Sequence, residues 1–137
     1  MKKAVISMAI VLLCCTFAAA QNRSGSYGTQ TQGPQITNGP VAEYVADSKA
    51  TIGWSVQNPG STMTIKYGTD RDHMDQTAQA AAGSDGRNFH ARLQSLSPET
   101  RYYFQVMQDN QAAGGVGTFR TVASGAAPIK SRATIPQ

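Results

Sequence analysis

The feature that most constrains this chain is a two-residue alternation of apolar and polar side chains through its middle part. In KATIGWSVQ, residues 49–57, every second side chain is apolar. Because successive side chains of a β-strand point to opposite faces of a sheet, this alternation predicts a strand with one buried face and one exposed face. The alternation recurs in TMTIKYG (62–68), NFHARLQ (88–94) and YYFQVMQ (102–108).

Turn residues separate these segments and limit the strands to short lengths. Asn58-Pro59-Gly60, Gly83-Ser84-Asp85-Gly86 and Ser97-Pro98-Glu99 all carry turn chemistry. Weaker strands are expected at 35–37, 41–46 and 116–122, whereas the alanine-rich 76–83 is short and has no amphipathic face. The sequence therefore predicts an all-β fold, a seven-stranded antiparallel sandwich of the immunoglobulin-like type.

The N-terminal segment MKKAVISMAIVLLCCTFAAAQ has the parts of an export signal. Lys2 and Lys3 precede an apolar run, and the small residues 18–20 offer a cleavage site. A membrane-spanning helix needs about 20 apolar residues, and this run is shorter. We expect residues 1–20 to be a cleaved signal peptide, with retention as an anchor as the alternative. The mature protein would then be secreted or periplasmic, without membrane attachment.

Composition divides the remainder into three parts. Residues 21–33 are polar and glycine-rich, which predicts a flexible leader. Residues 34–123 are expected to form the folded domain, and residues 124–137 a flexible C-terminal tail. Both cysteines, Cys14 and Cys15, lie in the signal, so the mature domain is expected to fold without a disulfide.

Charge and motifs argue against several classes of function. Loss of Lys2 and Lys3 with the signal lowers the formal net charge from +4 to +2, and the other basic residues are spread singly along the chain. Nucleic-acid binding, which favours clustered basic residues, is therefore not expected. The sequence has no nucleophile elbow and no phosphate-binding loop. We expect no catalytic activity.

The stretch TDRDHMD, residues 69–75, holds three aspartates and one histidine and could suggest a metal site. A calcium loop requires oxygen ligands at alternate positions and a final bidentate glutamate, and this stretch supplies neither the full alternation nor the glutamate. A zinc site requires three or four converging ligands, and the second histidine, His90, lies on a different strand. We expect a solvated connector in which Asp70 and Asp72 bind turn amides, and no metal or other cofactor.

The segment LSPETRYYFQV, residues 96–106, resembles the signature of fibronectin type III domains. Its matching residues are Leu96, Pro98, Thr100 and Tyr102. The resemblance implies that the hydroxyl of Tyr102 binds back to the backbone of the preceding turn while its ring enters the core. Trp54, Tyr67 and the segment 117–121 fit the same pattern, so the resemblance covers about ninety residues.

A narrower similarity concerns one group of such domains. Residues 34–55 and 66–78 resemble the fibronectin-like domains that precede the catalytic domain of purple acid phosphatases and related metallophosphoesterases. The resemblance implies that Tyr67-Gly68-Thr69 closes a strand and that Met74 plugs the following loop. The Gly-Asp, Gly-Asn-His and Gly-His-x-His metal motifs of those enzymes are absent from this sequence.

A binding function is the main expectation. In the arrangement that the resemblance implies, one sheet exposes a mixed face, and tyrosine and arginine are enriched at protein interfaces. The face comprises Lys66, Arg101, Tyr103, Gln105, Met107 and Arg120. Its partner would be an unidentified protein or cell surface. An ordinary solvated sheet surface, and an edge strand that accepts a partner strand, are the alternatives at the level of the site.

Three functions remain open on the sequence. The first is an exported, non-catalytic interaction module, and the second is an accessory domain that acts beside a metallophosphoesterase. The third, an autonomous enzyme, has the least support because the motifs are missing.

Overall fold

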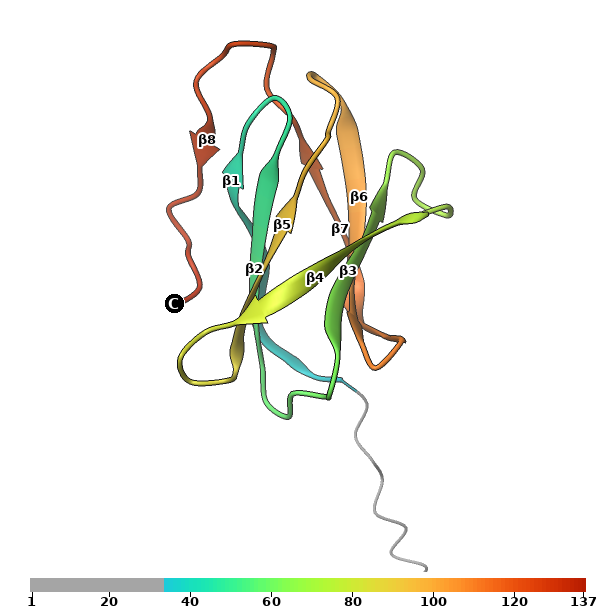
Figure 1. Cartoon of the computed structure of the whole chain (residues 1–137), viewed down its shortest axis with the longest axis vertical. Helices are drawn as coiled ribbons and strands as arrows, with labels where there is room; N and C mark the ends of the chain where they lie inside the picture. The colour runs from blue at the N-terminus through green and yellow to red at the C-terminus, as the bar shows by residue number, and fades with distance from the viewer. Residues whose placement is uncertain (1–33) are drawn as a thin grey trace, which may run out of the picture. The chain divides into compact units, whose positions relative to one another are not determined.

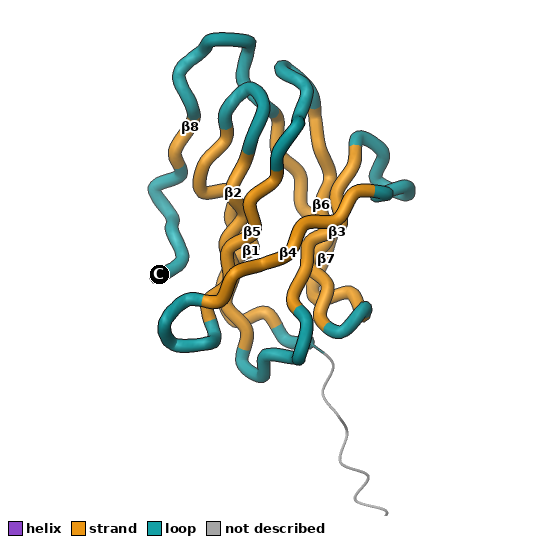
Figure 2. Tube along the Cα trace, in the orientation of Figure 1, coloured by secondary structure: helices purple, strands orange, loops and turns teal. Residues whose placement is uncertain are grey.

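Strands form all of the regular secondary structure in the described part of this chain. The computed structural model describes residues 34–137, which contain no helix (Figure 2). The predicted signal peptide and leader, residues 1–20 and 21–33, lie outside this range. The strands are β1 (Ile36–Val45), β2 (Ala50–Val56), β3 (Met63–Gly68), β4 (Gln76–Ala82), β5 (Asn88–Leu93), β6 (Arg101–Gln108), β7 (Gln111–Arg120) and β8 (Ile129–Lys130).

All strand pairs are antiparallel and belong to one sheet, in the order β7-β6-β3-β4-β5-β2-β1-β8. The sheet curls so that β1, β2 and β5 form one layer and β3, β6 and β7 form the other (Figure 1). The prediction of an all-β antiparallel sandwich is confirmed.

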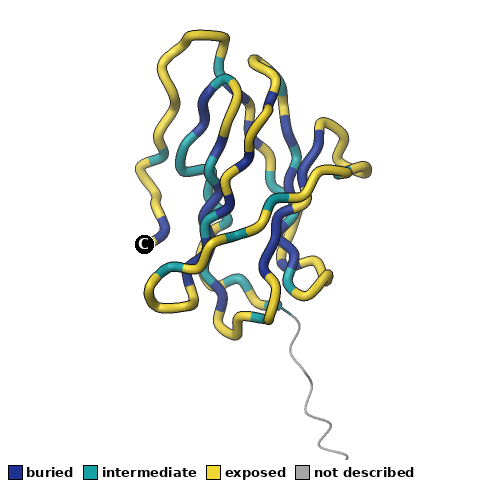
Figure 3. Tube along the Cα trace, in the orientation of Figure 1, coloured by how far each residue is buried: buried dark blue, intermediate teal, exposed yellow. Residues whose placement is uncertain are grey.

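The two layers enclose one apolar core, as the two-residue alternation predicts. Every side chain that the four main alternating segments direct inward is buried (Figure 3). Trp54 is fully buried and stacks on Phe89, with ring centroids 6.1 Å apart. In the other layer the rings of Tyr102 and Phe119 stack at 5.6 Å. Burial of such large side chains supplies the main driving force for folding in a domain without a disulfide.

The predicted number of strands, seven, is wrong, because the described residues form eight. The expected strands at 35–37 and 41–46 are one strand, β1, whose register shifts between Asn38 and Val41. Pro40 lies within this shift and cannot donate to the ladder, so the strand continues through an irregularity instead of ending. Strands β4 and β8 were not predicted from the sequence.

Strand β4 links the two layers. Its residues up to Gln79 pair with β3, and its residues from Ala80 onward pair with β5. Figure 1 shows it crossing obliquely from one layer to the other. Only Ala78 and Ala80 pack against the core, and both are half-buried. Because these side chains are small, the sequence shows no alternation of large apolar residues here.

Residues 124–137, for which the composition predicts a flexible tail, lie against the β1–β2–β5 layer in the structure. We call this segment the C-terminal strap. Its strand β8 pairs with β1, with Lys130 opposite Tyr44 and Ile129 opposite Val45. Ile135 is only 2% exposed. The difference arises because one buried aliphatic side chain and a few backbone hydrogen bonds hold the strap, and such sparse contacts leave no pattern in the sequence.

The expected tyrosine corner is present. The backbone N–H of Ser97 donates to the hydroxyl oxygen of Tyr102 at 2.8 Å, and the Tyr102 ring is buried. This bond fixes the turn before β6 and therefore the start of the strand that carries most of the predicted interaction face.

Candidate functional site

The predicted interaction face lies on the outer side of β3, β6 and β7. Because residues paired across an antiparallel ladder point to the same side of a sheet, the register shows which side chains share this face. Lys66 is opposite Gln105, and Arg101 is opposite Arg120. Tyr103 lies between Arg101 and Gln105 on β6 and points the same way. The structure therefore brings these five residues together.

Arg101 and Arg120 form a like-charge pair directly across β6 and β7. Both side chains are exposed. Within residues 34–137 the one ion pair is between His90 and Glu43, so neither arginine has a carboxylate partner there. Like charges directly opposite each other destabilise a sheet. The face thus carries an unneutralised positive charge that an anionic group would offset.

A shallow hollow of about 220 Å³ extends this face toward the loop between β3 and β4. Lys66 and Arg71 supply positive charge at the hollow, and Asp72 supplies one negative charge. Met74, the expected apolar plug of the loop, is half-buried and also lines the hollow. The hollow therefore presents basic, acidic and apolar groups within reach of the β6 side chains.

Two of the predicted face residues are less available than the sequence suggests. Met107 is only 8% exposed and contributes to the buried apolar set, so its assignment to the exposed face is corrected. It lies between Thr64 and Ala112 on the neighbouring strands, and Thr64 is buried as well. The Gln105 amide donates to the carbonyl oxygens of Ala113 and Gly114, where the β6–β7 register shifts.

The loop 69–75 behaves as the expected connector at Asp70. The N–H of Asp72 donates to Oδ1 of Asp70 at 2.9 Å, which closes a turn between exposed residues. Asp72 itself accepts no hydrogen bond from the residues that the structure describes, so the expected role is present for one of the two aspartates. In residues 34–137 no group of three His, Cys, Asp or Glu side chains converges in a way that could hold a metal ion.

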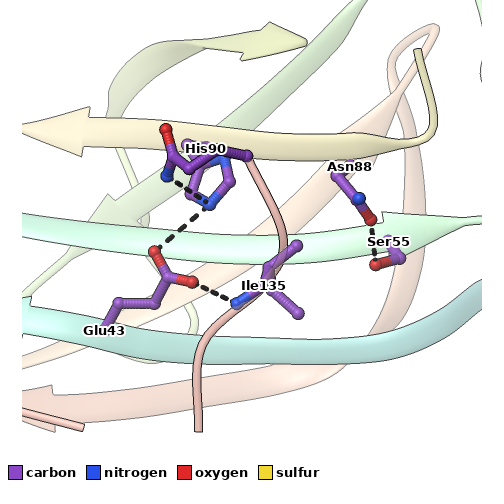
Figure 4. Close-up of polar contacts among 6 residues, drawn as sticks. Glu43, Ser55, Asn88, His90 and Ile135 are labelled. Carbon is purple, nitrogen blue, oxygen red and sulfur yellow. Dashed lines mark hydrogen bonds and ion pairs between the residues drawn. The ribbon is translucent and has the colours of Figure 1, made fainter. Parts of the chain in front are cut away.

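A second polar cluster, on the opposite layer, was missed by the sequence reasoning. Glu43 Oε2 lies 3.3 Å from His90 Nε2, and the two side chains are 10% and 12% exposed (Figure 4). Beside them, Ser55 donates to Asn88 at 2.6 Å, and the Asn88 amide donates to Asp85. Glu43 belongs to β1 and His90 to β5, so the contact joins strands that are distant in sequence.

Among the described residues, three groups have shifted pKa values, and none of these three lies on the predicted face. The backbone N–H of Gly125, followed by the hydroxyl of Ser48, lowers the pKa of Asp47. The backbone N–H groups of Arg87 and Asn88 lower the pKa of Asp85. Burial raises the pKa of Tyr67, with a smaller contribution from Tyr102. Each shift is explained by packing or turn structure, and none points to acid–base catalysis.

Residues 34–137 contain no helix that is long and apolar enough to span a membrane. No curated protein matches the chain.

The solved structures that are similar to the chain include two forms of the sensor domain of the anti-sigma factor RsgI4 from Pseudobacteroides cellulosolvens. The shorter form has 24% sequence identity and a TM-score of 0.50, over 66% of this chain and 95% of that one. The longer form has 23% identity and a TM-score of 0.49, over 74% of this chain and 96% of that one. The likeness to the shorter form supports the fold alone.

A family model gives the more specific result. The model of the purple acid phosphatase N-terminal domain matches residues 37–121, which run from β1 to just beyond β7 and form more than half of the 137-residue chain. This agrees with the resemblance carried by residues 34–55 and 66–78. The match stops before the C-terminal strap. The chain therefore belongs to the family of purple acid phosphatase N-terminal domains.

Proposed function

We propose that this domain is an exported, non-catalytic binding module that contacts an acidic surface of a partner protein through the outer face of β3, β6 and β7. The observation that carries this proposal is the exposed pair of Arg101 and Arg120, directly opposite each other and without a carboxylate partner in the described range. Tyr103 lies between Arg101 and Gln105 on β6 and is half-buried. Its ring supplies an aromatic surface of the kind that is enriched at interfaces.

The exposed charges of the face determine the kind of interaction that it can make. Its charged groups are exposed and therefore solvated, so each contributes chiefly to the association rate and to specificity. Binding through such groups weakens as salt screens them, with a Debye length of about 8 Å at physiological ionic strength. A strong dependence on ionic strength is therefore expected.

A glutamate-rich peptide with a fluorescent label can serve as a probe of this surface. Anisotropy titration should show saturable binding to the wild-type chain, weakened by about tenfold or more in the double variant Arg101→Ala/Arg120→Ala, as expected for loss of two charged contacts. Arg87→Ala/Arg92→Ala removes the same charge from residues outside the face and should bind like the wild type. Equal weakening in both double variants would show that only net charge matters and would refute the proposal.

A second candidate is an accessory domain that acts beside a metallophosphoesterase, and the family match is the observation that favours it. In this case a purple acid phosphatase catalytic domain, produced separately, should bind the chain in analytical ultracentrifugation. The Arg101→Ala/Arg120→Ala variant should reduce that binding if both proposals describe the same surface. Absence of any complex at micromolar concentrations would remove this candidate.

A further inference from the structure

On the β1–β2–β5 layer, an irregularity in β1 changes the direction of the Glu43 side chain. In the β1–β2 ladder Ala42 lies opposite Ile52 and Tyr44 opposite Thr51, so Glu43 is the extra residue of a bulge. A bulge changes the direction of a side chain relative to the regular ladder. Glu43 lies over the sheet in this way and is only 10% exposed.

Gly53 makes the room that this carboxylate occupies. A Cβ atom at Gly53 would lie 2.7 Å from Oε1 of Glu43 and 3.0 Å from Cγ1 of Ile135. His90 is directly opposite Gly53 on β5, and its Nε2 approaches the second carboxylate oxygen. Three neighbouring strands therefore form a socket. Gly53 is its floor, Glu43 supplies an acceptor, and His90 lies beside that acceptor.

The C-terminal strap fills this socket in the manner of a bound peptide (Figure 4). The N–H of Ile135 donates to Oε1 of Glu43 at 2.5 Å, and the Ile135 side chain is buried over Gly53. The Gln137 amide nitrogen lies 3.3 Å from Nε2 of His90. Upstream, β8 pairs with the edge of β1, and the N–H of Ser131 donates to the carbonyl oxygen of Glu43. Strand pairing combined with a side-chain pocket is a common mode of recognition of extended peptides.

Few contacts hold the strap in place. Ile135 is the one buried residue between 124 and 137, and β8 has two residues. Segments with one apolar anchor and an otherwise exposed backbone open at a small fraction of the global unfolding free energy. Beyond Gln137 lies a hollow of about 370 Å³, lined in part by His90, Arg92 and Gln79, which could accommodate a longer occupant.

We propose that the Glu43–Gly53–His90 socket is a peptide-binding site and that the strap is its built-in competitor. The site takes, from a separate molecule, an extended peptide with an aliphatic residue followed two positions later by a side-chain amide. The Glu43 carboxylate binds the backbone N–H of the aliphatic residue, Gly53 admits its side chain, and His90 binds the amide. This inference is independent of the proposed function, which concerns the opposite layer.

The test uses the full chain and a labelled peptide with the sequence of residues 131–137, SRATIPQ. Ile135→Asp places a charge in the apolar socket and should release the strap while leaving Glu43, Gly53 and His90 unchanged. Anisotropy should show saturable binding of the peptide to this variant, at least about tenfold tighter than to the wild type, whose site is occupied. The same peptide with aspartate in place of isoleucine should not bind.

A matched variant distinguishes binding in the socket from nonspecific binding of the peptide. Gly53→Val in the Ile135→Asp background fills the floor and should abolish binding, and Trp54 fluorescence checks that the domain is still folded. If Ile135→Asp does not fold, Ile135→Ala provides a milder release, with the same expected order of affinities.

Three outcomes would overturn the proposal. The first is no saturable binding to a folded strap-released variant, and the second is equal binding of the two peptides. The third is a wild-type dimer that forms with rising concentration and is lost in Ile135→Asp. That dimer would show that the site takes the strap of a second copy of this chain in place of a separate peptide.

Discussion

At the scale of single residues, Tyr102 connects the core to the turn that precedes β6. Its ring stacks on Phe119 inside the sandwich, and its hydroxyl accepts the N–H of Ser97. The residue thus joins apolar packing to the geometry of the backbone outside the core. The strand that begins at Arg101 depends on this junction for its position.

Tyr102→Phe is expected to lower the free energy of unfolding by about 1 kcal/mol, because the ring packing is kept while the N–H of Ser97 loses its acceptor. Urea unfolding followed by circular dichroism measures the change. Tyr103→Phe removes a hydroxyl from the half-buried outer side of the same strand and should have a smaller effect. Equal effects of the two substitutions would contradict the role assigned to the Tyr102 hydroxyl.

The contacts and burial of individual residues differ in how well the sequence predicts them. The Tyr102 hydroxyl bond was expected from the resemblance of residues 96–106 to fibronectin type III domains, and the structure confirms it. The approach of Glu43 to His90 was not expected, because it depends on a bulge in β1 and on the missing side chain of Gly53. Met107 was placed outside by alternation, which specifies a face of the strand but not how deeply neighbours such as Thr64 cover it.

At the scale of elements, the turn between β4 and β5 is organised by one carboxylate. Asp85 Oδ1 accepts the N–H groups of Arg87 and Asn88, and Oδ2 accepts the side-chain amide of Asn88. The amide oxygen of Asn88 in turn accepts the hydroxyl of Ser55 on β2. The turn is therefore tied to the β1–β2–β5 layer through Asn88, which is buried.

Asp85 should make this turn sensitive to acid. Its pKa in the folded state is lowered from the ordinary value of 3.8, chiefly by the N–H of Arg87. A carboxyl group whose folded pKa is lower than its unfolded pKa stabilises the protein above the unfolded value, and this contribution is lost as the pH falls through the folded pKa. The wild type should therefore exceed Asp85→Asn in thermal stability at neutral pH.

The two proteins should converge as the pH falls through the lowered folded-state pKa of Asp85, because the aspartate is then protonated in both states. Melting temperatures between neutral pH and about pH 2.5 test this convergence. Asp47, whose pKa is also lowered, is present in both proteins and cancels in the comparison. Asp72→Asn, at an exposed side chain in the β3–β4 loop, controls for the change in net charge. A stability difference that does not vary with pH would contradict the assignment.

Strands β4 and β8, which were not predicted from the sequence, both lack large buried side chains. The four alternating segments were predicted because residues such as Trp54 and Ile65 must be removed from water. Strand β4 contributes only alanines to the core, and β8 is exposed throughout. Both elements exist through backbone pairing, which all residues except proline can provide and which therefore leaves little trace in the sequence.

At the scale of the whole molecule, the single tryptophan reports on both layers at once. Trp54 lies on β2 and is fully buried in the core cluster, which contains residues from each layer. The cluster is continuous, so the layers are expected to lose their packing together.

Unfolding in urea should consequently give one transition, with the same midpoint by tryptophan fluorescence and by far-ultraviolet circular dichroism. The native emission should be blue-shifted because the indole is excluded from water, and it should move to the red on unfolding. A fluorescence midpoint that differs from the circular dichroism midpoint would show that the layer around Trp54 unfolds separately. Native emission at the wavelength of free tryptophan would contradict the burial of the ring.

The candidate face could be predicted only in part from the sequence. Alternation and the fibronectin-like pattern brought Lys66, Arg101 and Arg120 to one side of one sheet, as the structure has them. That no carboxylate of residues 34–137 pairs with the two arginines depends on where the fold places these acidic residues in space. The hollow next to Lys66 depends on the loop between β3 and β4.

The course of β4 also has a mechanical consequence. Because this strand hydrogen-bonds first to one layer and then to the other, the layers cannot slide past each other without breaking backbone bonds along it. A sandwich whose layers met only through side chains would resist shear by interdigitation alone. Here a pulling force on one layer is passed to the other through a continuous backbone ladder.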